Sequence, residues 1–187
     1  MPREAKIIAV PTGDRKDAKQ KICDAAIRCF EQYGPQRTSM ADIAEESGIS
    51  RKTLYRIFDD RASLIEYILL RRMYIMADKV SEKLAHYTDY EEAIVEGSIY
   101  SVNVSKGDKL FNDILTRDTN HRVEMFLLGP PDEVRQDIAE IWSGRIALAP
   151  QKGPVRNVLS DEPVLELLTT THVLLPLPVI LPSVDCL

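Results

Sequence analysis

Apolar residues recur every three or four positions along most of the chain, which is the spacing of amphipathic helices. One such stripe predicts a helix over residues 17–33, and another predicts a helix over residues 61–85 that would span roughly 37 Å at about 1.5 Å per residue. Further helices are predicted over residues 89–105, 106–117, 119–128, 131–149 and 161–175, with Gly and Pro at the breaks. No stretch alternates polar and apolar residues long enough to predict a sheet. The pattern therefore predicts an all-α protein of about nine helices.

Two of these helices are short and lie close together in residues 38–58, TSMADIAEESGISRKTLYRIF. Ser39 is placed to cap the first helix, and Asp42 three residues later completes a weak capping box. Gly48 supplies the turn, since glycine readily adopts the positive φ that helix exits commonly require. Ser50 caps the second helix, and the small Ala44 allows the two helices to cross closely. The segment is predicted to be a helix-turn-helix.

The second short helix divides into an apolar side and a basic side. Leu54 and Phe58, four residues apart, are predicted to face the core, which leaves a cationic and hydroxyl-bearing surface. Such a surface suits the DNA major groove, where Arg and Lys reach guanine edges and hydroxyls bind phosphates. A solvated helical hairpin is the alternative, and the spacing together with the basic face favours DNA binding. The candidates for base reading are Arg51, Lys52 and Thr53, and those for phosphate contact are Thr38, Ser39, Tyr55 and Arg61.

The charge is distributed unevenly between the two ends of the chain. The net charge is −5, yet residues 1–61 hold 12 Lys and Arg against 10 Asp and Glu, a balance of +2. The remaining residues hold 12 against 19, a balance of −7. Because phosphate attraction depends on locally focused positive charge, the acidic total does not argue against DNA binding.

Several classes of protein are not favoured by the sequence. No apolar run approaches the roughly 18 residues of a membrane helix, and no secretory signal is visible, so we expect a cytoplasmic protein. Three widely separated cysteines suggest neither a disulfide framework nor a metal motif. No phosphate-binding loop or nucleophile motif is present. We therefore expect no cofactor, no metal and no enzymatic activity.

Residues 15–65 resemble the tetracycline-repressor (TetR) family of bacterial transcription regulators. The resemblance lies in Phe30, Gly34, Thr38-Ser39-Met40, Asp42-Ile43-Ala44, Gly48-Ile49-Ser50, Thr53-Leu54-Tyr55, Phe58 and Leu64-Ile65. Ile57 departs from the family, whose members often carry an aromatic residue or His there, and no contact role is assigned to it. Arg61 stands where Lys is frequent and keeps the positive charge.

The predicted organisation is a flexible arm (residues 1–14), a three-helix DNA-binding domain (15–60) and a larger helical bundle for ligand binding and dimerisation (61–187). The resemblance implies a homodimer that binds a near-palindromic DNA operator as a repressor and is released by a small apolar effector. The dimer contact is predicted on the apolar faces of residues 131–149 and 161–175. Residues suited to an apolar pocket, or alternatively to plain core packing, are Met73, Tyr74, Tyr100, Phe111, Met125, Phe126 and Trp142.

Two alternatives to an effector-released repressor remain open at this stage. One is a constitutive helix-turn-helix protein with no effector. The other is a helical small-molecule carrier whose DNA motif is vestigial. The apolar, proline-rich C-terminal tail has no assigned role.

Overall fold

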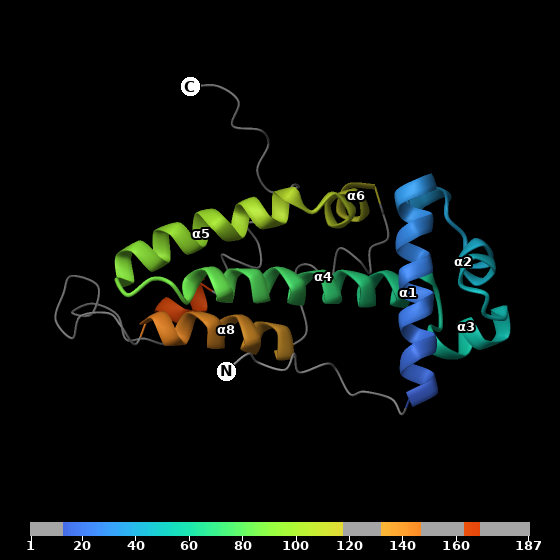
Figure 1. Ribbon diagram of the computed structural model, residues 1–187, viewed down its shortest axis with the longest axis horizontal. Helices are drawn as coiled ribbons and strands as arrows, with labels where there is room; N and C mark the ends of the chain where they lie inside the picture. The colour runs from blue at the N-terminus through green and yellow to red at the C-terminus, as the bar shows by residue number, and fades with distance from the viewer. Residues whose placement is uncertain (1–12, 118–131, 147–162, 169–187) are drawn as a thin grey trace, which may run out of the picture. The chain divides into compact units, whose positions relative to one another are not determined.

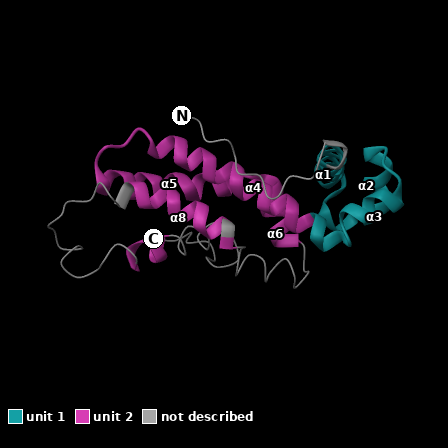
Figure 2. Cartoon of the chain, turned by 90° about the horizontal axis from the view of Figure 1, so that it is seen from below, with its two compact units in different colours: residues 1–64 teal, residues 65–187 magenta. Residues whose placement is uncertain are grey.

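The computed structural model describes residues 13–117, 132–146 and 163–168 (Figure 1). Within these ranges every regular element is a helix, which confirms the predicted all-α class with an N-terminal helix-turn-helix. The chain divides into two compact units, residues 1–64 and residues 65–187 (Figure 2). The division falls inside α4 (Arg61–Leu84), so that one continuous helix has residues in both units.

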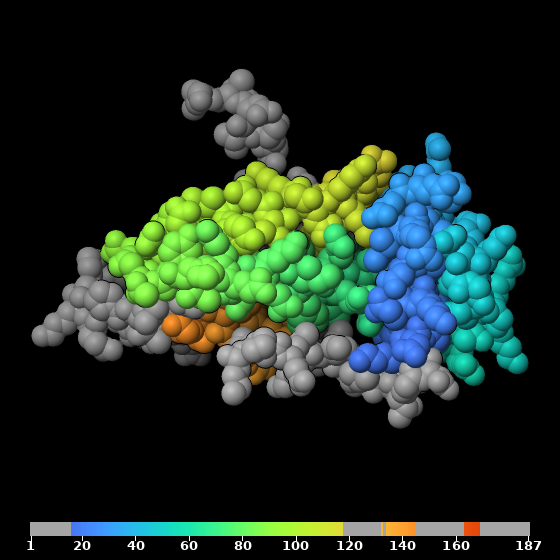
Figure 3. All heavy atoms as spheres, viewed as in Figure 1, coloured from blue at the N-terminus to red at the C-terminus, as the bar shows by residue number. Residues whose placement is uncertain are grey.

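The first unit contains α1 (Gly13–Tyr33), the short 3-10 helix η1 (Pro35–Arg37), α2 (Met40–Ser47) and α3 (Arg51–Ile57). α1 lies against α2 and α3, and its side chains meet those of α2 without a gap (Figures 1 and 3). The core of the first unit is formed by side chains that are at most 5% exposed: Ile22, Cys23, Ala25, Ala26, Cys29, Phe30, Ile43, Ala44, Leu54, Phe58 and Leu64. Burial of this apolar surface is the main force that holds the three helices together.

The second unit contains the remainder of α4, α5 (Tyr90–Gly107), α6 (Lys109–Arg117) and α8 (Asp132–Ile146), and residues 163–168 are also helical. Its core joins Val80 and Leu84 of α4 to Ala93 of α5 and Trp142 of α8. Seven partly buried side chains pack around this cluster, namely Tyr87, Ile94, Tyr100, Ile138, Ile141, Leu165 and Leu168.

The apolar face of α8 is used inside the chain. Ile138, Ile141 and Trp142 all pack into the core shared with α4 and α5. The described side chains that α8 exposes are Asp132, Arg135, Gln136, Glu140, Ser143 and Gly144, which are polar or small. These side chains therefore pack within the chain, and the dimer contact predicted on residues 131–149 and 161–175 stays a prediction.

The helix boundaries differ from the predicted ones mainly at two places. α1 begins at Gly13 rather than at Asp17, so the predicted arm is shorter by two residues. The break between α5 and α6 comes at Asp108 instead of just before Lys106, since Asp108 ends one helix and caps the next. The remaining arm, the helix predicted over residues 119–128, the ends of the last two predicted helices and the tail lie outside the described residues.

Candidate nucleic-acid interface

The start of α2 is set by a reciprocal pair of hydrogen bonds between Ser39 and Asp42. The Asp42 backbone N–H donates to Ser39 Oγ (3.2 Å), and the Ser39 backbone N–H donates to Asp42 Oδ2 (2.8 Å). The Ser39 hydroxyl donates to the same carboxylate oxygen at 2.8 Å. These hydrogen bonds hold the pKa of Asp42 below its ordinary value, and the charge of Arg51 adds to the effect. The capping box predicted from the sequence is therefore present.

The turn between α2 and α3 depends on Gly48, whose φ of 65° lies in the left-handed region. Its N–H donates to the carbonyls of Ala44 and Glu45, which ends α2, and the N–H of Ile49 also donates to Ala44. Ser50 then begins α3 by accepting a hydrogen bond from the Thr53 N–H at 3.2 Å. Because a side chain at Gly48 would be strained at this φ, the glycine is what allows so short a connection.

α3 turns its apolar side into the unit and its basic side outward. Leu54 is completely buried and Phe58, just after the helix, is 4% exposed. Arg51, Lys52, Tyr55 and Arg56 are exposed, and Thr53 is partly exposed beside Ser50. No Asp or Glu occurs within α3. The outward side, Arg51, Lys52, Thr53, Tyr55 and Arg56, is called the α3 basic face below, and it offers cations and hydroxyls suited to duplex DNA.

Side chains of α1 brace α2 and α3 from behind. The Nε of Arg28 pairs with Glu46 of α2 at 2.6 Å, and both side chains remain about half exposed to water. The ammonium of Lys19 lies 5.5 Å from the centre of the Phe58 ring. An exposed ion pair contributes little to stability, so the buried apolar contacts of α1 do most of the positioning.

Thr38 was predicted to contact phosphate, and the structure places its side chain inside the first unit. It is only 3% exposed, and its hydroxyl donates to the carbonyls of Gly34 (3.0 Å) and Cys29 (3.3 Å). The hydroxyl therefore links the segment before α2 to the end of α1, and the phosphate contact of Thr38 stays a prediction.

Arg61, a second predicted phosphate contact, is also occupied within the chain. Its guanidinium donates to the backbone carbonyls of Pro35 and Thr38 and lies 5.9 Å from the centre of the Phe30 ring. These contacts tie the start of α4 to the segment that leads into α2. The side chain is partly buried, so in this arrangement its positive charge serves the fold, and a phosphate contact would compete with three internal ones.

The other predicted DNA contacts lie on the surface. Ser39 is exposed but has its hydroxyl committed to the capping box, whereas Tyr55 is 49% exposed. Two exposed cations near these residues, Arg37 at the end of η1 and Arg56 on α3, were given no contact role in the sequence analysis. The position of Arg56, four residues after Lys52 on the same side of the helix, was a signal for it. The exposed position of Arg37 depends on η1, a short helix that the sequence did not predict.

The residues predicted to line an apolar pocket fall into different places. Trp142 is 1% exposed and packs in one cluster with the partly buried Tyr100. Phe111 of α6 is buried, and Met73 and Tyr74 of α4 are partly buried. Met125 and Phe126 lie outside the described residues. The pocket therefore stays a prediction.

Two other kinds of site are absent from the residues that the structure describes. Among residues 13–117, 132–146 and 163–168, no group of three or more His, Cys, Asp or Glu is arranged to hold a metal ion. None of the described helices has the length and apolar character needed to cross a membrane. Burial, together with nearby Glu46 and Asp42, raises the pKa of the Cys29 thiol, which disfavours its reactive thiolate form.

The geometry of residues 39–58 defines a helix-turn-helix, and comparisons with known proteins show which proteins this chain is similar to. Residues 22–68 match the family model described as bacterial regulatory proteins, tetR family. An uncharacterized HTH-type transcriptional regulator of Mycobacterium tuberculosis is 28% identical over 146 residues, which cover 78% of this chain and 74% of the relative. A regulator of Staphylococcus aureus is 34% identical over 79 residues, covering 42% of this chain and 43% of the relative. Residues 22–68 are therefore similar to the DNA-binding domain of the tetR family, which is the resemblance that the sequence predicted.

Solved structures share the fold over most of the chain. The TetR family repressor AlkX from Dietzia has a TM-score of 0.60 at 18% identity, with 89% of this chain and 87% of that chain covered. The fatty acid degradation regulator FadR from Bacillus halodurans has a TM-score of 0.58 at 16% identity, with 87% and 82% covered. At these identities the likeness establishes the architecture of the helical body and no more.

Proposed function

We propose that the protein is a repressor that binds a near-palindromic operator through the α3 basic face. The observation that carries the proposal is the division of α3 into a buried side anchored by Leu54 and an exposed side with three cations and no carboxylate. Arg51, Lys52 and Thr53 are the proposed base-reading residues, because they lie in the first turn of the recognition helix. Tyr55 and Ser39 remain proposed phosphate contacts, to which we add Arg37 and Arg56.

We further propose that the operator is bound by a homodimer. One α3 covers only part of a single major groove, and two copies related by a two-fold axis would read half-sites about 34–36 Å apart. The predicted dimer contact lies on residues 131–149 and 161–175, where Ile138, Ile141 and Trp142 of α8 also pack into the chain's own core. Leu167, which is 65% exposed in the helix of residues 163–168, is one apolar side chain available for this purpose.

The effector is proposed to be a small apolar molecule held by the second unit, where Tyr100 and Trp142 are the predicted residues that share one cluster. Such a molecule would have to prefer one conformation of the protein over the other, since equal binding to both would not change DNA affinity. If apolar compounds bind the protein without altering its affinity for the operator, that outcome favours a constitutive DNA-binding protein instead.

Selection of bound duplexes from a random DNA pool tests the proposal directly. A recovered inverted repeat with half-site centres about one helical turn apart would support the class, the dimer and the spacing together. Recovery of a single unrepeated site would contradict the dimer, and recovery of no preferred sequence would contradict operator recognition. The matched control is the Arg51→Ala, Lys52→Ala double variant, which should recover no enriched motif while keeping the helical content of the wild-type chain.

A further inference from the structure

The outward side of α5 carries an apolar stripe that the chain leaves exposed. Val95 is 56% exposed and Ile99, about one turn later, is 51% exposed, while Val102 is partly exposed. The opposite side of the helix is buried in the second unit through Ala93 and Gly97. Single exposed apolar side chains are common in soluble proteins, so what the stripe does has to be inferred from the residues that flank it.

Residues of opposite charge stand at the two ends of the stripe. Glu92 precedes Val95 by three residues, and Lys106 follows Val102 by four. Both charged side chains are exposed, and neither forms an ion pair among the residues that the structure describes. Intervals of three and four residues are the spacing of a seam between two packed helices. The α5 stripe, as it is called below, consists of Glu92, Val95, Ile99, Val102 and Lys106.

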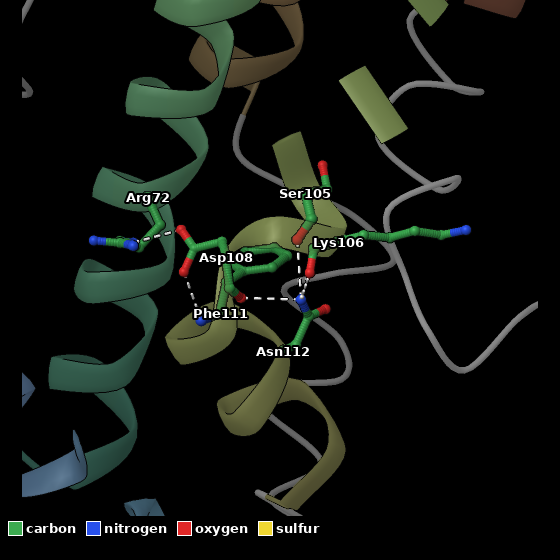
Figure 4. Close-up of polar contacts among 6 residues, drawn as sticks. All are labelled: Arg72, Ser105, Lys106, Asp108, Phe111 and Asn112. Atoms are coloured by element: carbon green, nitrogen blue, oxygen red, sulfur yellow. Dashed lines mark hydrogen bonds and ion pairs between the residues drawn. The ribbon is translucent and has the colours of Figure 1, made fainter. Parts of the chain in front are cut away.

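The backbone at Lys106 is held by polar contacts, and its side chain is not part of them. The Lys106 carbonyl accepts a hydrogen bond from the side-chain amide of Asn112 at 3.1 Å. The same amide donates to the carbonyls of Ser105 and Asp108, both at 2.9 Å. Figure 4 shows the Lys106 side chain extending away from these contacts. The positive charge at this end of the stripe therefore stands on an anchored backbone and faces solvent.

The α5 stripe is symmetric about Ile99 in position and opposite in charge. Glu92 lies seven residues before Ile99 and Lys106 lies seven residues after it, so each is about two turns, or roughly 10 Å, from the centre. Two copies that meet antiparallel at Ile99 place Glu92 of each opposite Lys106 of the other. The apolar positions then meet one another between these charges. The same patch serves both copies, as a two-fold contact requires, whereas a parallel pairing would oppose like charges.

We propose that the α5 stripe binds the α5 stripe of a second copy of this chain in antiparallel orientation. The contact involves no DNA, and it is separate from the dimer contact predicted on residues 131–149 and 161–175. The self-complementary charges favour a second copy over an unrelated partner, because the stripe supplies both members of each ion pair. Three apolar positions per helix bury less than the roughly 1,200 Å² of a stable interface, so the association is weak and depends on concentration.

Charge reversal at the two ends tests the orientation of the contact. Glu92→Lys opposes two lysines at each end of the contact, and Lys106→Glu opposes two carboxylates. The assay is sedimentation velocity of the full-length chain over a range of protein concentrations. We expect each single variant to raise the apparent dissociation constant of self-association by about tenfold. The double variant and an equimolar mixture of the two single variants should both associate like the wild type, because each restores opposite charges.

Ile99→Lys tests the apolar centre, since it places two like charges at the two-fold axis. We expect this variant to lose the association at every concentration at which the wild type shows it. Ile75→Lys is the matched control, because it makes the same change at an isoleucine of α4 that is 42% exposed. The control should associate like the wild type, and thermal unfolding of each variant shows whether the fold is retained.

Three results would overturn the proposal. If Ile99→Lys associates like the wild type, the α5 stripe is not a contact between copies. If Ile99→Lys lowers the unfolding midpoint and leaves the association unchanged, the stripe is covered within its own chain. If neither the double variant nor the mixture regains association, the antiparallel pairing is wrong. None of these measurements includes DNA, so their outcome is independent of whether the chain binds an operator.

Discussion

Arg51 offers the sharpest test of how the α3 basic face uses its charges. The side chain is exposed in the first turn of α3. We predict that Arg51 reads a base, and that Arg51→Ala removes this contact without disturbing the core formed by Leu54.

The expected loss is about 1–3 kcal/mol at the selected operator, which corresponds to a roughly 5- to 150-fold weaker affinity. The assay is a fluorescence anisotropy titration of the operator and of a scrambled duplex at several salt concentrations. A base contact predicts a large loss on the operator and a small loss on the scrambled duplex. A phosphate contact predicts equal losses on both, with a salt dependence reduced by about 0.9 in slope.

Arg28→Ala is the matched control for this measurement. It removes one positive charge from the same unit, but from α1, where the side chain pairs with Glu46 at 2.6 Å. We expect Arg28→Ala to weaken binding to both duplexes slightly and to the same extent. Equal losses on the two duplexes for Arg51→Ala as well would refute the assignment of base reading to this residue and leave it among the backbone contacts.

Further predictions concern stability and follow from local geometry. A methyl group at Gly97 would lie 2.6 Å from Leu84 Cδ2, so Gly97→Ala should destabilise the second unit by about 1–3 kcal/mol in thermal unfolding. A methyl group at Gly144 in α8 would meet open space, so Gly144→Ala should stabilise the unit by about 0.5–1 kcal/mol in the same measurement. Ser39→Ala should cost about 1 kcal/mol through loss of the α2 cap. Because folding lowers the pKa of Asp42, the stabilisation that its carboxylate gives the folded state is complete above the ordinary pKa of 3.8. This stabilisation is lost as pH falls through the pKa of the folded state. Asp42→Asn should therefore be less stable than the wild type at neutral pH, and the gap in unfolding midpoint should close below pH 3.8; a gap independent of pH would contradict this reasoning.

The helix-turn-helix could be predicted from the sequence because its signals are local. Ser39 and Asp42 are three residues apart, and Leu54 and Phe58 are four residues apart, so their relation is set by helix geometry alone. Gly48 is recognised by a conformation that few other residues adopt, and the structure gives it φ 65°. Each of these features depends on neighbours within one or two turns, where periodicity and capping rules carry enough information.

Thr38 and Arg61 were assigned to DNA because a polar side chain beside a recognition motif has no local sign of an internal partner. The acceptors of the Thr38 hydroxyl include a carbonyl nine residues earlier, and Arg61 donates to the carbonyl of Pro35, 26 residues earlier. Carbonyl acceptors are also invisible in a sequence, since every residue has one. Only the packing of α1 against the segment before α2 brings these groups together.

The second unit shows a different limit of sequence reasoning, and it bears on how the protein is regulated. An apolar stripe predicts which side of a helix is buried, but it does not say whether the partner is the same chain, a second copy or a ligand. On α8 the stripe that includes Trp142 is buried against α4 and α5, where the close approach of Gly97 admits the indole ring. Trp142 therefore serves the core first, and an effector that reached it would have to displace native packing.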